Sequence, residues 1–255
     1  MPYKAYLIDL DGTMYLGEQQ IEAASDFVKL IKERNLPLLF VTNNSSAKPE
    51  NVAKKLNDFD IPALEQEVLT SSMAAASYIA DQKQGASVYM IGEEGLEHAL
   101  TAKGLVFDDE NPDFVVMGID REVTYEKFAK ACLAVRKGAT FLSTNPDAAL
   151  PTERGFLPGN GSLTSVVHYS TGVTPTYIGK PEAIMIEQAL KQLNVRKEEA
   201  IMVGDNYATD IMAGINAGVD TLLVYTGVTT KEHLSSVEKM PTFEIQSLNE
   251  WKFDE

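Results

Sequence analysis

Two aspartates, Asp9 and Asp11, stand two positions apart directly after an apolar run at residues 6–8. Such a run is typical of a buried parallel strand, and Gly12 and Thr13 interrupt it. Acids at the carboxyl end of a strand lie where open α/β sheets bind their ligands. Because two buried like charges are unfavourable without a cation or a reaction that requires them, the pair indicates a reactive site.

Three further polar clusters follow predicted strands in the same way. They are Thr42 with Asn43 and Asn44, then Lys180, and lastly Asp205 with Asp210. Taken alone, each could be a turn, a helix cap or a solvated side chain. The ends of strands in one parallel sheet point the same way, so the joint order favours one converging site.

Such a set would perform phosphoryl transfer. Asp9 could attack phosphorus and form an aspartyl-phosphate. Asp11 could protonate the leaving oxygen and then deprotonate the attacking water. The Thr42 hydroxyl and the side chains of Asn43 and Asn44 could hold the non-bridging oxygens of the phosphate.

The same acids predict a magnesium site, because Mg²⁺ prefers hard oxygen ligands. Asp9, Asp205 and a group at Asp11, its carbonyl in the first instance, are the expected ligands. Asp210 is expected either to bind the ion directly or to form hydrogen bonds with the residues that bind it. Lys180 would supply positive charge as negative charge shifts in the transition state.

Short apolar runs alternate with helical patterns along the chain, which predicts a doubly wound parallel sheet of the α/β class. The predicted strands are residues 5–10, 37–42, 87–91, 114–119, 140–143, 176–178, 200–203 and 221–225. The predicted helices are residues 21–34, 48–59, 71–82, 94–103, 125–137, 181–193 and 209–218. Residues 144–162 contain three prolines and three glycines without periodicity, and we expect a functional loop there.

The chain has no low-complexity linker, so a second domain is expected as an insertion. Its predicted limits, turns near residues 81–85 and 172–176, divide the chain into a core of residues 1–82 and 177–255 and an inserted domain of residues 83–176.

Composition narrows the classes of partner. The formal charge of −15 disfavours nucleic acid and anionic membrane surfaces, and no apolar stretch is long enough to span a membrane. Cys132 is the single cysteine, which excludes an intrachain disulfide and fits a cytoplasmic location. The glycine fingerprints of a P-loop and of a dinucleotide-binding turn are absent from the sequence.

These motifs together resemble those of the haloacid dehalogenase superfamily of phosphatases. Asp9-x-Asp11-Gly12-Thr13 is similar to its first motif, Thr42 to the second, Lys180 to the third, and Asp205 with Asp210 to the fourth. The strings at residues 40–44, 158–162 and 204–210 resemble the NagD-like, p-nitrophenylphosphatase branch, in which a type C2 cap is inserted between the second and third motifs.

The resemblance implies a Rossmann-like core, an inserted α/β cap, Mg²⁺ as cofactor, and hydrolysis of small phosphomonoesters. Nucleoside monophosphates, sugar phosphates and p-nitrophenyl phosphate are substrates in that family. Cap loops select among them, and the candidates here are Asn145, Asp147, Glu153 and Arg154. An exposed cap surface could also form a homodimer.

Two alternatives use similar residues. A phosphotransferase or phosphomutase would pass the phosphate from Asp9 to another hydroxyl. A receiver module would carry a phosphorylated Asp without rapid turnover, but its acidic pair precedes the phosphorylated residue, and here the pair itself contains the presumed nucleophile.

Overall fold

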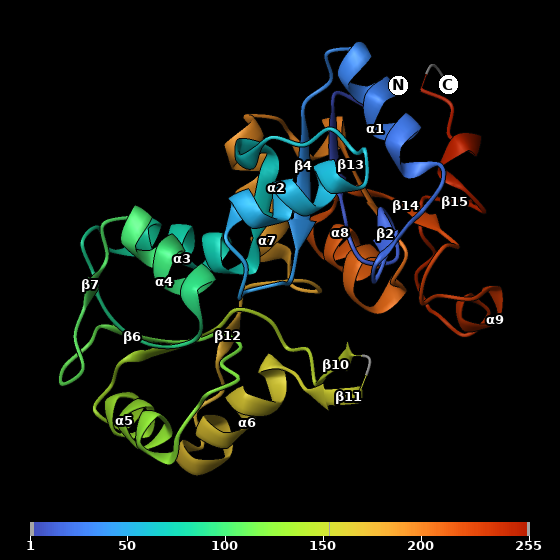
Figure 1. Ribbon diagram of the computed structural model, residues 1–255. Helices are drawn as coiled ribbons and strands as arrows, with labels where there is room; N and C mark the ends of the chain where they lie inside the picture. Colours follow the sequence, from blue (N-terminus) through green and yellow to red (C-terminus); the bar gives the residue numbers. More distant parts are fainter. Residues whose placement is uncertain (1–2, 153, 254–255) are drawn as a thin grey trace. The chain divides into compact units, whose positions relative to one another are not determined.

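The computed structural model describes residues 3–152 and 154–253, which form two compact units (Figure 1). The first unit, called the core, comprises residues 3–42, 49–69 and 180–253. The second unit, called the cap, comprises residues 43–48 and 70–179. The chain therefore passes between the units four times, and the cap is an insertion made of two segments.

A six-stranded sheet in the order β15-β14-β13-β1-β4-β5 forms the centre of the core. Its central strand β1 is buried at every residue, which explains why its sequence is apolar throughout. From β1 the chain leads to β4 on one side, while β13 pairs in parallel on the other. The strands are β1 (Ala5–Ile8), β4 (Leu38–Thr42), β5 (Val68–Thr70), β13 (Ala200–Gly204), β14 (Asp220–Val224) and β15 (Phe243–Ile245).

The order of these strands reverses between β1 and β13. In an open parallel sheet, this reversal opens a crevice at the carboxyl ends of the two strands, and ligands bind there. The doubly wound α/β fold expected from the sequence is confirmed, and its reversal lies where Asp9 and Asp205 follow their strands.

Amphipathic helices cover the core sheet. In α1, the buried residues include Ala24, Phe27, Val28 and Ile31, a spacing that places them on one helical face. The core helices are α1 (Ala24–Glu33), α2 (Pro49–Asp58), α7 (Ala183–Leu193), α8 (Met212–Ala217) and α9 (Lys231–Leu234). Within residues 3–152 and 154–253, no helix is both long and apolar enough to cross a membrane.

The cap contains a second parallel sheet, in the order β12-β9-β8-β6-β7. Helices α5 and α6 contact each other (Figure 1). An apolar cluster of the cap includes Val115, Phe141 and, from α6, Val167. The cap strands are β6 (Ser87–Ile91), β7 (Val106–Phe107), β8 (Phe114–Met117), β9 (Thr140–Ser143) and β12 (Thr176–Tyr177); its helices are α3 (Ser71–Gln82), α4 (Glu94–Ala102), α5 (Tyr125–Arg136) and α6 (Asn160–Thr171).

The strand order of the cap sheet reverses between β6 and β8, and the chain's own segment 43–48 occupies that position. The Gly95 amide donates to the carbonyl of Ser46 over 3.0 Å, and the Ile119 amide donates to Oγ of Ser45 over 3.0 Å. These donors follow β6 and β8 respectively. The crevice in which a free sheet of this type would bind a ligand is thus filled from within.

Helix α3 belongs to the cap, whereas the limits predicted from the sequence place residues 71–82 in the core. The Ser71 and Ser72 hydroxyls donate to the carbonyls of Asn43 and Ser45, each over 2.8 Å, and α3 contacts α4. The compact units therefore differ from the predicted division into 1–82 with 177–255 and 83–176. Amphipathic spacing shows that a helix has a buried face, but it does not show which sheet covers that face.

Most of residues 144–162 is regular, in contrast to the expected loop. Strands β10 (Ala149–Thr152) and β11 (Gly155–Pro158) form an antiparallel hairpin, and α6 begins at Asn160. The hairpin is largely exposed and includes two prolines. Helix α6 buries Asn160 and Thr164 beside Val167, so its inner face has no apolar period to reveal it.

Short pieces outside the predicted pattern complete the chain. They are β2 (Tyr15–Leu16), β3 (Gln19–Gln20), the 3-10 turns η1 (Glu65–Glu67), η2 (Lys197–Glu199) and η4 (Leu248–Glu250), and the π-helical turn η3 (Tyr207–Ile211).

Candidate active site

Asp9 and Asp205 lie side by side at the carboxyl edge of the core sheet. Parallel pairing aligns Ile8 with Val203, and the Asp9 amide continues the ladder by donating to the Val203 carbonyl over 2.9 Å. Residues that stand almost two hundred positions apart in the sequence are thereby brought to adjacent strand ends.

Three carboxylates form a tight cluster there. One oxygen from each of Asp9, Asp205 and Asp210 lies within 4.8 Å of the others, and all three residues are buried. The π-helical turn η3 carries Asp210, whose Oδ2 accepts a hydrogen bond of 3.0 Å from the Asn206 amide. An inserted turn of this kind often marks a functional site.

Lys180 is the cation of this cluster and is only 2% exposed. Its Nζ donates to Asp9 Oδ1, to the Val41 carbonyl over 2.9 Å, and pairs with Asp210 Oδ1 at 2.8 Å. The motif order predicts that this lysine lies beside the acids, and the structure brings them together. One ammonium beside three carboxylates leaves an excess of negative charge.

The ionisation of these groups follows from their crowding. Burial and then the neighbouring Asp210 raise the pKa of Asp9 well above its usual value, although Lys180 opposes this. The same two causes raise the pKa of Asp205 to about 6. Burial acts to lower the pKa of Lys180, but Asp210 and Asp9 outweigh it, so that pKa is raised and the lysine stays charged.

The Asp205 carboxylate is held from several sides. Thr13 Oγ1 donates to its Oδ1 over 3.1 Å, and the Val228 amide donates to its Oδ2 over 2.7 Å. Gly12 has φ +92°, and a Cβ there would lie 2.4 Å from the Asp205 side chain. Glycine at this position therefore meets both a left-handed backbone and a close approach.

Asp11 differs from Asp9 in its surroundings. It is exposed, and its side chain is not part of the carboxylate cluster. Although the residue is exposed, partial desolvation of its carboxyl group raises the pKa of Asp11, while nearby Lys55 and a hydrogen bond from the Gly17 amide oppose the shift. A carboxyl group with a raised pKa at an open position is suited to exchange protons.

Thr42 ends β4, the strand that pairs with β1 on the side opposite β13, and it is buried. Asn43 and Asn44, expected to bind phosphate beside it, make hydrogen bonds within the cap. Asn43 Nδ2 donates to both Asp147 oxygens over 3.2 and 3.3 Å. Asn44 Oδ1 accepts from the Ser46 amide over 2.9 Å, an Asx turn. Binding of phosphate by these side chains stays a prediction.

The four predicted selectivity residues occupy different settings in the cap. Asn145 is buried, and its Nδ2 donates to the Asn43 carbonyl over 2.8 Å. The Asp147 carboxylate accepts a hydrogen bond from the side chain of the same Asn43. Arg154 is exposed at the tip of the β10–β11 hairpin. Glu153 lies outside the described residues.

Several groups that contact the predicted site residues could not be identified from the sequence alone. Thr13 was part of the first motif but had no assigned role, and the Val41 carbonyl and Val228 amide are backbone groups that no residue type encodes. Asn160 stood in a glycine-rich string and is a buried polar centre in the structure.

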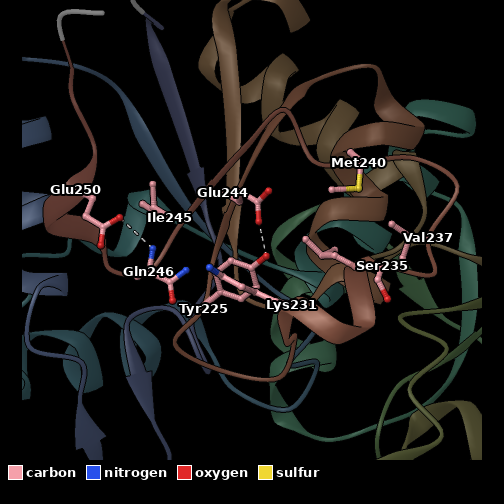
Figure 2. A pocket seen from close by; sticks show the side chains of 10 residues that line it. Tyr225, Lys231, Ser235, Val237, Met240, Glu244, Ile245, Gln246 and Glu250 are labelled. Carbon is pink, nitrogen blue, oxygen red and sulfur yellow. Dashed lines mark hydrogen bonds between the residues drawn. The ribbon is translucent and has the colours of Figure 1, made fainter.

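A separate cavity of about 570 Å³ lies in the core beside α9 and β15 (Figure 2). Its polar groups form hydrogen bonds with one another: the Tyr225 hydroxyl donates to Glu244, and the backbone N–H of Gln246 donates to the Glu250 carboxylate over 3.2 Å (Figure 2). None of the predicted catalytic residues lines it.

Comparison with known proteins agrees with the geometry. Residues 6–106 match the family model of haloacid dehalogenase-like hydrolases, and residues 177–251 match a HAD-hydrolase-like model. The 5'-nucleotidase YutF of Bacillus subtilis is 63% identical over 249 residues, covering 98% of this chain and 97% of that protein. An acid sugar phosphatase of Staphylococcus saprophyticus is 55% identical, covering 97% of this chain and 96% of that protein.

Solved structures extend the comparison to the whole fold. A single mutant of a thermostable NPPase from Geobacillus stearothermophilus has a TM-score of 0.94 and 58% identity, covering 99% of this chain and all of that one. NagD from E. coli K-12 has a TM-score of 0.93 and 33% identity, with the same coverage. The chain therefore belongs to the haloacid dehalogenase-like hydrolases and is a phosphatase of their NagD-like, p-nitrophenylphosphatase branch.

Proposed function

We propose that this phosphatase hydrolyses small phosphomonoesters with Mg²⁺ through an aspartyl-phosphate on Asp9. The observation that carries the proposal is the placement of Asp9 against Lys180, Asp205 and Asp210 at the reversal of the strand order. A buried nucleophile beside a fixed cation and two more carboxylates is arranged for phosphoryl transfer.

In the first step, a carboxylate oxygen of Asp9 forms a bond to phosphorus as the bond from phosphorus to the ester oxygen breaks. Asp11 gives its proton to the departing oxygen, which leaves as the alcohol. The raised pKa of Asp11 supports this role, because the acid must hold a proton before it can give one.

In the second step, water attacks the same phosphorus and the bond to the Asp9 oxygen breaks, releasing inorganic phosphate. Asp11, now ionised, takes the proton of that water and returns to its starting state. Lys180 keeps its charge throughout and balances negative charge beside Asp9. We assign Thr42, Asn43 and Asn44 to the non-bridging oxygens, as the motif order suggests.

The acidic cluster fits a divalent cation. Three buried carboxylates supply hard oxygen ligands within 4.8 Å of one another. Burial and then repulsion from Asp210 raise the pKa values of Asp9 and Asp205, and a bound cation would oppose both effects. Bound there, Mg²⁺ would neutralise phosphate charge and polarise its oxygens. Asp9, Asp205 and Asp210 are the proposed side-chain ligands, with the Asp11 carbonyl as a further one.

The names of the relatives suggest the class of substrate. They describe a 5'-nucleotidase, acid sugar phosphatases and p-nitrophenyl phosphatases. We infer that nucleoside monophosphates, sugar phosphates and p-nitrophenyl phosphate are substrates here, and that Asn145, Asp147, Glu153 and Arg154 discriminate among them. The charge of −15 supports a small metabolite in preference to nucleic acid or a membrane surface. We also propose a cytoplasmic location and a homodimer formed through the cap.

The test is release of inorganic phosphate from a panel of these esters, with and without Mg²⁺ after treatment with EDTA. Asp9→Asn should lower kcat by about 10³-fold or more, because an amide is a poor nucleophile. Asp58→Asn is the control, since Asp58 is an exposed residue paired with nearby Lys54, and it should keep wild-type activity. An Asp9→Asn variant with undiminished turnover would overturn the proposal, and so would formation of an isomer without free phosphate.

A further inference from the structure

Asn160 is the centre of a buried polar group at the start of α6 and is 1% exposed. Its Nδ2 lies 2.9 Å from Ser143 Oγ, 2.9 Å from the Asn145 carbonyl and 3.1 Å from Thr144 Oγ1. The side-chain amide of Asn160 has only two hydrogens to donate. It shares them among three acceptors, which belong to Ser143, the last residue of β9, and to Thr144 and Asn145, which follow it.

The backbone of the next residues is fastened to the same helix start. The Gly161 amide donates to the Asp147 carbonyl over 2.8 Å, and Ser162 Oγ donates to the Ala148 carbonyl over 2.6 Å. A Cβ at Gly161 would lie 2.1 Å from the Pro146 carbonyl oxygen. Segment 145–148 thus lies directly against the start of α6, at a distance that only glycine permits.

The side chains of this fastened segment hold Asn43. Asn145 donates to the Asn43 carbonyl over 2.8 Å, and the Asp147 carboxylate accepts from Asn43 Nδ2. Asn43 follows Thr42 directly in the chain. The connections therefore run from Asn160, through Asn145 and Asp147, to Asn43, one of the residues proposed to hold the phosphate.

We propose that Asn160 is a positioning residue that sets the geometry of Asn145 and Asp147 and thereby the selectivity among phosphomonoesters. This inference rests on the proposed function of the site. Asn160 Oδ1 is buried and accepts no hydrogen bond from any residue that the structure describes. A buried acceptor without a hydrogen-bond donor destabilises the folded protein. We therefore attribute the role of this side chain to the hydrogen bonds that its Nδ2 donates to residues 143–145.

The experiment compares Asn160→Ala with Asn57→Ala. Asn57 is the control: it is an exposed asparagine of the core whose Nδ2 donates to two backbone carbonyls, those of Ala53 and Ala63, over 2.7 and 2.8 Å. Hydrogen exchange of residues 144–148 should become about tenfold faster in Asn160→Ala and stay unchanged in Asn57→Ala. Ser162→Ala should also speed hydrogen exchange of residues 144–148, but by a smaller factor. This variant replaces Asn160→Ala in the experiment if Asn160→Ala does not fold.

The second readout is the ratio of kcat/KM for a nucleoside monophosphate to that for p-nitrophenyl phosphate. Asn160→Ala should change this ratio by roughly tenfold to a hundredfold, whereas lost folded protein lowers both values equally. Unchanged exchange overturns the inference, and so does faster exchange with an unchanged ratio. A wild-type protein without phosphatase activity would instead overturn the proposed function; exchange then decides alone whether Asn160 positions the segment.

Discussion

Asp9 and Asp11 are the same type of residue, two positions apart, in opposite environments. Asp9 is buried against Lys180, and Asp11 is exposed. The pKa of each is raised chiefly by desolvation, but only Asp9 also has other carboxylates among the causes. Environment therefore separates the two proposed tasks, a nucleophile held in place and a proton carrier open to substrate.

Thr13 should control the affinity for Mg²⁺ through Asp205, because its hydroxyl donates to that carboxylate over 3.1 Å. Thr13→Val removes the donor at nearly constant volume. We expect the Mg²⁺ concentration for half-maximal phosphatase activity to rise by roughly 10–100-fold. Thr13→Ser keeps the hydroxyl and should remain close to wild type. An unchanged Mg²⁺ requirement in Thr13→Val would show that this hydrogen bond does not orient Asp205.

At the scale of elements, two parallel sheets use their strand-order reversals differently. The core reversal between β1 and β13 presents Asp9 and Asp205. The cap reversal between β6 and β8 receives segment 43–48 through the Gly95 amide and Ser45. The core reversal thus carries the carboxylates of the proposed site, and the cap reversal fixes the chain that directly follows Thr42.

Asp113 ties the starts of β6 and β8 together in the cap. Its carboxylate accepts from Lys83 Nζ over 2.7 Å and from the Ser87 amide over 2.9 Å, and these bonds lower the pKa of Asp113 to about 2. A lowered folded-state pKa stabilises the protein above the ordinary pKa of an aspartate, and that contribution is lost as the pH falls through about 2.

Asp113→Asn should therefore lower the melting temperature at neutral pH, and the gap from wild type should narrow between about pH 4 and about pH 2. Melting curves of both proteins across this range check the sign. Asp58→Asn, which removes an exposed ion pair of one helical turn, should show little gap at any of these values. A gap for Asp113→Asn that is constant with pH would contradict the assignment.

At the scale of the whole molecule, negative charge is concentrated as well as abundant. The chain carries a net charge of −15. The carboxylates of Asp9, Asp205 and Asp210 form one buried cluster, and Lys180 is the lysine that lies against it. A ligand that binds only the folded state stabilises it by mass action. The cluster should thus couple cation binding to the stability of the fold.

Removal of divalent ions should lower the melting temperature. At about 100 times the dissociation constant, binding contributes about 2.7 kcal/mol, which corresponds to roughly 5–10 °C for a chain of this size. The measurement is a thermal melt with EDTA and with increasing MgCl₂, and NaCl at equal ionic strength is the control. Asp205→Asn should lose most of the Mg²⁺ effect. An equal rise with NaCl would indicate screening of charge in general.

Local patterns in the sequence were enough to predict the class of fold and the main polar positions. Apolar runs predicted the strands that lead to Asp9, Thr42 and Asp205, because a strand buried on both faces is largely apolar. Helix α6 and the β10–β11 hairpin were not predicted, since one buries polar residues and the other is exposed. Periodicity reports burial of apolar groups only.

By itself, the sequence determined the α/β class, the order of the motifs and the kinds of group that could meet, because these depend on residue type and spacing along the chain. Tertiary structure decided which groups do meet: Lys180 with Asp9 and Asp210, Thr13 and the Val228 amide with Asp205. It also decided that α3 and segment 43–48 belong to the cap. The physical reason is that strand order, backbone donors and shared buried faces arise from contacts between segments far apart in the chain, which no local pattern encodes.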